Sequence, residues 1–177
     1  YDVSLFELLN LLFNYTLKIN DAWNYQQKIM KFAIKIGSLK LVELLINNGI
    51  NSNLTIDDIA TPLISYAVRL KKIEIINFLI KANADINQSN NNGDIPLHEA
   101  IRTADSEFIE FLLKQPLNIN NLDNKVRPMI VAIEHFNLIK KDIFATDLSE
   151  IEKTEQVAKS RQKLFKIVDL LIKYGAD

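Results

Sequence analysis

Four short apolar segments with one shared pattern recur along the chain. Residues three and four positions apart lie on one face of a helix, so each segment is predicted to be a helix with one buried face. The segments are KLVELLI at 40–46, EIINFLI at 74–80, EFIEFLL at 107–113 and KIVDLLI at 166–172. Aligned, they place Leu41, Ile75, Phe108 and Ile167 in one column, and Leu45, Leu79, Leu112 and Leu171 in another. The first three follow one another at 34 and 33 residues, which indicates a repeat architecture.

An asparagine column and a set of shorter apolar segments keep the same period. The column comprises Asn20, Asn53, Asn87 and Asn120. The shorter segments are KFAIKIG at 31–37, LISYAVR at 63–69 and LHEAIR at 97–102. Each unit is therefore predicted to contain a short helix, a tight turn, a longer apolar helix and a polar loop. Helices this short are marginal alone in water, so stacking on neighbours must hold them, as in a solenoid.

Short motifs between the helices resemble those of ankyrin repeats. Thr61-Pro62-Leu63 and Ile95-Pro96-Leu97-His98 resemble the family's TPLH motif, and residues 84–87 and the final Gly175-Ala176-Asp177 resemble its GADVN segment. The resemblance implies an all-α solenoid of helix-turn-helix units with hairpin finger loops. We expect Thr61 to cap a helix whose first residue is Pro62. The resemblance also implies that the His98 imidazole bonds locally and steadies the turn.

The array departs from the family pattern in several places. Asn83 replaces a glycine after the second helix and can still adopt a left-handed conformation, whereas Pro116, at the same place in the next repeat, cannot. An insertion of about 27 residues, roughly 138–163, separates the last pair of helices. Ser149 and Glu152 form a capping-box pattern, which predicts one long helix from about Ser149 into the 167–174 segment. The insertion is either a tolerated extension or a second binding surface.

These features predict one array over residues 1–177. Its parts are a partial repeat at 1–20, repeats at about 21–53, 54–87, 88–120 and 121–177, and a helical insertion at about 138–163. The apolar stretch LFELLNLLF would be the second helix of the partial repeat. The chain opens at Tyr1 without an initiator Met, so we expect it to be part of a longer protein.

Composition narrows the possible functions. The 177 residues carry a formal net charge of -1, which gives no long-range attraction to nucleic acid. No apolar run approaches the length that spans a bilayer. The chain contains no cysteine, so disulfides and thiolate metal sites are excluded, and a reducing compartment such as the cytoplasm fits. We expect a monomer that binds no nucleic acid and does not insert into a membrane.

The sequence offers little for catalysis. It has two histidines, His98 and His135, and none of the HExxH, P-loop or GxGxxG motifs. The Asp57-Asp58 pair is more typical of a solvated loop than of an acid/base couple. We therefore predict no catalytic residues, no metal site and no cofactor.

The family resemblance implies protein binding through a concave surface, formed by fingertips and the exposed side of the first helices. At the fingertips the candidate residues are Trp23, Tyr25, Asp57, Ile59, Asp94 and Arg127, and on the first helices they are Phe32, Lys35, Ile36, Arg69, Glu99, Arg102, Glu134 and His135. Trp23, Tyr25, Arg69 and Arg102 are the preferred anchors, because Trp, Tyr and Arg are the commonest binding hot spots. Trp23 could equally cover the partial first repeat.

Three hypotheses of function follow. The first is a non-enzymatic module that recognises a partner protein, as part of a pathogen effector in the cytosol of a host cell. The second is a substrate-recruiting arm of a larger enzyme. The third is a spacer without a specific ligand.

Overall fold

The computed structural model describes residues 23–120 and 126–176, with side chains from Tyr25 onward. The partial repeat predicted at 1–20, including Asn20, lies outside these residues. The chain divides after Asp85 into two compact units. In the described part of each unit the regular elements are α-helices, and an isolated antiparallel bridge joins Thr55 and Pro62.

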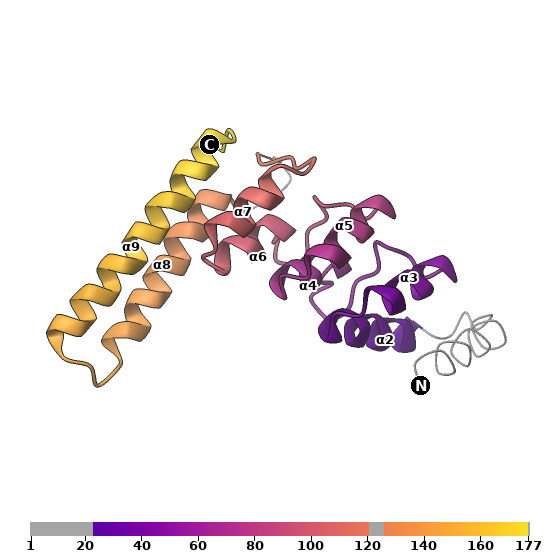
Figure 1. The fold of residues 1–177 in the computed structure, drawn as a ribbon, viewed down its shortest axis with the longest axis horizontal. Helices are drawn as coiled ribbons and strands as arrows, with labels where there is room; N and C mark the ends of the chain where they lie inside the picture. The colour runs from indigo at the N-terminus through magenta and orange to yellow at the C-terminus, as the bar shows by residue number, and fades with distance from the viewer. Residues whose placement is uncertain (1–22, 121–125, 177) are drawn as a thin grey trace. The chain divides into compact units, whose positions relative to one another are not determined.

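The described part of unit 1 consists of two helix pairs (Figure 1). The pairs are α2 (Trp23–Ile36) with α3 (Leu39–Asn47), and α4 (Leu63–Arg69) with α5 (Ile73–Lys81). α2 packs on α4 and α3 packs on α5, so like helices stack. The predicted Leu45 and Leu79 of the second column are fully buried between them. The burial of each such leucine contributes roughly 1.5 to 3 kcal/mol.

Unit 2 repeats the arrangement with a longer final pair. Its helices are α6 (Pro96–Arg102), α7 (Ser106–Leu113), α8 (Pro128–Phe144) and α9 (Glu150–Lys173). α6 packs on α8, α7 packs on α9, and the apolar columns continue with buried Leu112 and Leu171. Figure 1 shows α8 and α9 running side by side well beyond the ends of α6 and α7. We call this pair the α8–α9 hairpin.

The hairpin contains the residues of the predicted insertion. Residues 138–144 prolong α8, residues 145–149 make the turn, and residues 150–163 form the first part of α9. The predicted capping box is confirmed: Ser149 Oγ accepts the Glu152 N–H at 3.4 Å, and Glu152 Oε2 accepts the Ser149 N–H at 3.0 Å. The helix that starts there continues without a break to Lys173, as predicted.

The asparagine column joins each loop to the loop of the following repeat. Asn53 Oδ1 accepts the Asp85 N–H at 2.7 Å, and Asn53 Nδ2 donates to the Asn83 carbonyl at 3.3 Å. Asn87 repeats this with the Asn118 N–H at 2.7 Å and the Pro116 carbonyl at 3.5 Å. The Asn120 amide donates to the Gly175 carbonyl at 2.6 Å. An amide is required because it donates and accepts at once.

Left-handed residues close the turns. Within each of the first three pairs the turn residue has positive φ: Gly37 at 75°, Lys71 at 53° and Ala104 at 52°. Only the first of these three is a glycine, so the other two adopt a conformation that side chains disfavour. After the second helices, Asn83 has φ 62°, which confirms that it can replace the family's glycine.

Two predictions about helix starts are wrong. The candidates Trp23 and Tyr25 belong to α2 and not to a finger loop, because no glycine or proline in residues 23–36 ends the helix. Thr61 does not cap α4, which begins at Leu63 with Pro62 as its N-cap residue. The Thr61 backbone instead pairs with Ile56 in the finger, and its buried Oγ1 has no hydrogen-bond partner in the described residues.

Replacing Asn53 by alanine should destabilise the protein, because it removes both bonds to the 83–85 loop. We expect a loss of about 1 to 2 kcal/mol in the free energy of unfolding, measured by urea denaturation. The control Asn47→Ala removes an exposed asparagine at the end of α3 and should change stability by less than about 0.5 kcal/mol. Equal effects of the two variants would contradict this role.

Ala104→Gly should stabilise the protein by about 0.5 to 1 kcal/mol, because glycine relieves the left-handed strain and this gain exceeds its entropic cost. The same change at the exposed Ala158, inside α9, should destabilise by about 1 kcal/mol. Thermal denaturation would show whether the two stability changes have opposite signs. A loss of stability in both variants would contradict backbone strain at Ala104.

Candidate functional site

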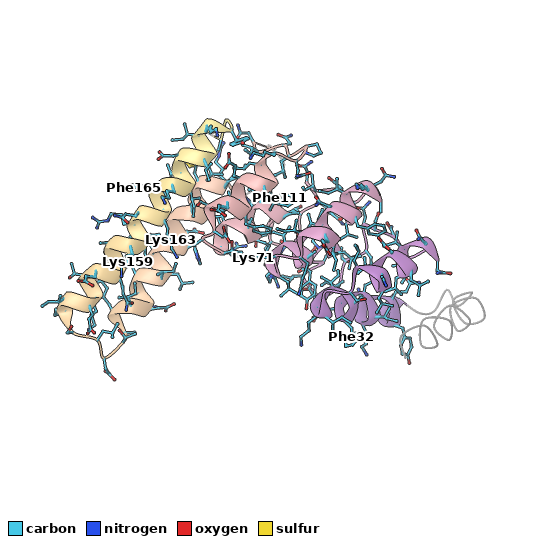
Figure 2. The ribbon with its side chains drawn as sticks, viewed as in Figure 1. Phe32, Lys71, Phe111, Lys159, Lys163 and Phe165 are labelled. Carbon is cyan, nitrogen blue, oxygen red and sulfur yellow. The ribbon has the colours of Figure 1, made fainter. Side chains whose placement is uncertain are left out.

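The exposed side of α2 carries a stripe of large apolar side chains. Tyr25, Phe32 and Ile36 are 74%, 56% and 54% exposed. Their spacings of seven and four residues place them on one face of the helix. Met30 and Ile34 on the opposite face are fully buried and fix the orientation of the helix. Figure 2 shows Phe32 on the side of α2 turned away from α3.

Lysines accompany this stripe. Lys28 and Lys35 are exposed and seven residues apart, so they lie along one edge of it. Lys31, further round the helix, lies with its Nζ 5.8 Å from the centre of the Tyr66 ring. The sequence of α2, WNYQQKIMKFAIKI, contains no acidic residue. We call Tyr25, Lys28, Phe32, Lys35 and Ile36 the α2 surface.

The finger loop of unit 1 contributes less to the candidate binding surface than predicted. Asp57 Oδ1 accepts the Thr61 N–H at 2.8 Å, so the half-buried carboxylate closes the loop on itself. Ile59 is 39% exposed beside it. The sequence thus predicted both residues at the finger, and the structure gives Asp57 a role in holding the loop.

In unit 2, four candidate residues gather around α6. Arg102 Nη2 donates to Asp94 Oδ1 at 2.8 Å, and Arg102 Nη1 lies 3.7 Å from Glu99 Oε1. Glu99 is buried and Arg102 is about one-third exposed. The charge of Arg102 also helps to lower the pKa of His135. Arg102 therefore holds its own helix to the preceding loop, and reversing its charge would leave a buried carboxylate without that partner.

His98 is the buried centre of this cluster. Its Nδ1 accepts the Ile95 N–H at 3.2 Å, which confirms the local bond expected of the imidazole. An accepting Nδ1 places the proton of the neutral ring on Nε2. Burial lowers the pKa of His98 to about 4, with Asp94 opposing and Arg102 assisting the shift. The ring is thus neutral at pH 7 and acts as a structural acceptor.

The remaining candidates are spread over the two units. Arg69 is exposed at the end of α4, Arg127 is exposed before α8, and Glu134 is exposed on α8. His135 is half-buried, and burial followed by the charge of Arg102 lowers its pKa. The side chain of Trp23 lies outside the described residues.

A cavity that the sequence did not predict lies between α6 and the α8–α9 hairpin. Its volume is about 180 Å³, and Ile101, His135, Phe136, Ser160, Lys163 and Ile167 are among its walls. The helical spacing of residues 132, 136 and 139 and of residues 160, 164 and 167 places each set on one face of its helix, but nothing in the sequence indicates the space between the two faces. The cavity is lined by His135 of α8 together with Ser160, Lys163 and Ile167 of α9.

Two absences apply to residues 23–120 and 126–176. No group of three or more His, Asp or Glu side chains there is arranged to hold a metal ion. None of the helices there combines the length and apolarity needed to cross a membrane.

Known proteins share these repeats. The profile of the family described as ankyrin repeats (3 copies) matches residues 2–90 and 64–143. The chain belongs to the ankyrin-repeat family. This confirms the predicted all-α ankyrin-repeat fold. Ankyrin repeats generally mediate protein–protein interaction, and the family is typically non-enzymatic.

Three relatives carry ankyrin-repeat names. One, from Borreliella burgdorferi, is 40% identical over 86 residues, which cover 47% of this chain and 21% of the relative. Two come from fowlpox virus. The first is 28% identical over a stretch that covers 97% of this chain and 52% of the relative. The second is 28% identical over a stretch that covers 72% of this chain and 18% of the relative. The chain therefore spans about half or less of the length of these ankyrin-repeat relatives.

The burial of neutral His98 should make stability depend on pH. The unfolded ring titrates near pH 6.5 and the folded ring near 4, so the unfolded state binds more protons between these values. Stability should therefore fall by about 1 to 2 kcal/mol from pH 7 to pH 5.

Urea denaturation at both pH values tests this dependence, with His98→Gln as the comparison. A glutamine at the third helical position can still accept the Ile95 N–H and does not titrate. Its stability should change much less between pH 7 and pH 5. An unchanged pH dependence in this variant would contradict the assignment.

Proposed function

We propose that this ankyrin-repeat chain is a non-enzymatic recognition module that binds a partner protein through the exposed sides of its first helices. The observation that carries the proposal is the α2 surface. Three large apolar side chains there are more than half exposed on one helix face, while the other face of the same helix is fully buried. Contiguous exposed apolar surface on a soluble domain is typical of an interaction site.

The cluster around α6 supports a second contact region within unit 2. Arg102 and Glu134 present charge beside the half-buried His135. Because the ion pairs with Asp94 and Glu99 orient Arg102, its guanidinium loses little freedom when a partner binds. Arg69, Asp57, Ile59 and Arg127 remain predicted contacts.

Two of the relatives come from fowlpox virus, and this origin supports a role of the chain in a host cell. We place this chain in such a compartment as part of an effector. The alternative, a substrate-recruiting arm of a larger enzyme, is favoured by the greater length of the relatives. Both alternatives use the same binding surface and differ in what else the whole protein carries.

The proposal predicts that a Phe32→Ser, Ile36→Ser double variant loses its partner without losing stability, because both side chains are exposed. The measurement is affinity capture from eukaryotic cell lysate, read by mass spectrometry, beside thermal denaturation of each bait. The control Ile151→Ser removes a 75% exposed isoleucine from the hairpin and should capture the same partner as the wild type. Identical capture profiles for all three baits would contradict the proposal, as would a partner loss that follows a fall in melting temperature.

A further inference from the structure

The α2 surface also indicates what kind of segment its partner presents. This inference rests on the function proposed above and concerns unit 1 alone. From Tyr25 to Ile36 the stripe extends about 16 Å, or three helical turns. Tyr25, Phe32 and Ile36 follow one another in single file along the helix, with Lys28 at the turn between the first two, so the surface is a narrow ridge. A ridge of this spacing fits the groove between the side-chain rows of a second helix.

An extended partner strand fits less well. Strand addition needs an exposed sheet edge with unpaired backbone groups. In the described part of unit 1 the extended pairing is the isolated Thr55–Pro62 bridge, which belongs to the finger and not to α2. The backbone of α2 is internally hydrogen-bonded, so a partner reaches only its side chains. An amphipathic helix meets that requirement.

The charge of the α2 surface favours a negatively charged partner. Lys28 and Lys35 are exposed on one edge of the stripe, and α2 contains no carboxylate to neutralise them. Carboxylates seven residues apart on a partner helix would face the two ammonium groups together. Exposed pairs of this kind contribute little affinity, about 0.2 to 1 kcal/mol each, but they orient the partner. The apolar stripe supplies the binding energy.

A membrane surface is the main competing occupant, because basic amphipathic helices also bind anionic lipid. Two observations favour a helix. Lys28 and Lys35 line one edge of the stripe, whereas headgroups would surround both edges. The chain as a whole has a formal charge of -1, which gives no general attraction to an anionic bilayer.

We propose that the α2 surface binds an acidic amphipathic helix of a partner protein. Apolar residues of that helix, three and four positions apart, pack on Tyr25, Phe32 and Ile36. Its carboxylates lie along the edge that carries Lys28 and Lys35.

The test begins with a displayed library of random 16-residue peptides selected on the full chain. Binders retained by the Phe32→Ser, Ile36→Ser variant are removed, which discards peptides attracted by charge alone. The enriched peptides should be net negative and carry apolar residues at spacings of three and four. Enrichment without these two features, or no enrichment, would overturn the inference. If another part of the chain covers the α2 surface, no peptide will be enriched. The inference that this surface binds an acidic helix would then also be wrong.

The second step measures the affinity of an enriched peptide by fluorescence anisotropy. Lys28→Glu, Lys35→Glu should weaken binding about tenfold or more, and lysines in place of the peptide's acidic residues should restore it. The matched control Lys40→Glu, Lys81→Glu makes the same charge change at exposed lysines of α3 and α5 in unit 1, and should weaken binding less than about twofold. Equal weakening by both variants would show a general charge effect and overturn the assigned edge.

The failures of the two proposals are distinguishable. If the α2 double variant loses a lysate partner but no acidic helical peptide is enriched, recognition by this surface stands and the partner chemistry is wrong. If phosphatidylserine vesicles bind the wild type and not the double variant, and no peptide is enriched, the occupant is a membrane. If neither lysate partner, peptide nor vesicle depends on the double variant, both proposals fail.

Discussion

Burial of the repeated leucine column between neighbouring helix pairs is the interaction on which the rest of the structure depends. Helices of seven to nine residues, such as α3 to α7, are too short to persist alone in water. Each becomes stable because Leu45, Leu79, Leu112 and Leu171 are removed from solvent within their units. With the second helices fixed in this way, the first helices keep one buried face and offer the other to a partner.

The asparagine column is the polar counterpart of this core. Loops without secondary structure leave backbone N–H and C=O groups that need partners. Asn53 and Asn87 each satisfy one N–H and one C=O of a loop about 30 residues further along the chain. The period of the leucines and the period of the asparagines must therefore agree, because a repeat of a different length would align one set and misplace the other.

Sequence periodicity predicted the features that the repeats share and missed the features that occur in one repeat only. The columns, the Asn83 conformation and the Ser149 cap were predictable, because each follows from local chemistry. The helical state of Tyr25 was not, since the finger expected there came from analogy with the other repeats. The ion pairs of Arg102 were also missed, because the sequence shows which charges lie on α6 but not which of them meet. The cavity beside His135 depends on how far α9 stands from α6, which no pattern encodes.

The α8–α9 hairpin has a consequence for how the protein folds. Its two helices are joined by five residues and pack along most of their length, so their contacts are close in sequence and cost little loop-closure entropy. The helix pairs of the other repeats, with seven to nine residues in most helices, gain less from pairing alone. In a linear array folding can nucleate at any repeat and then spread to its neighbours. Because contacts that are close in sequence form fastest, we expect folding of unit 2 to start in the hairpin that the insertion lengthens.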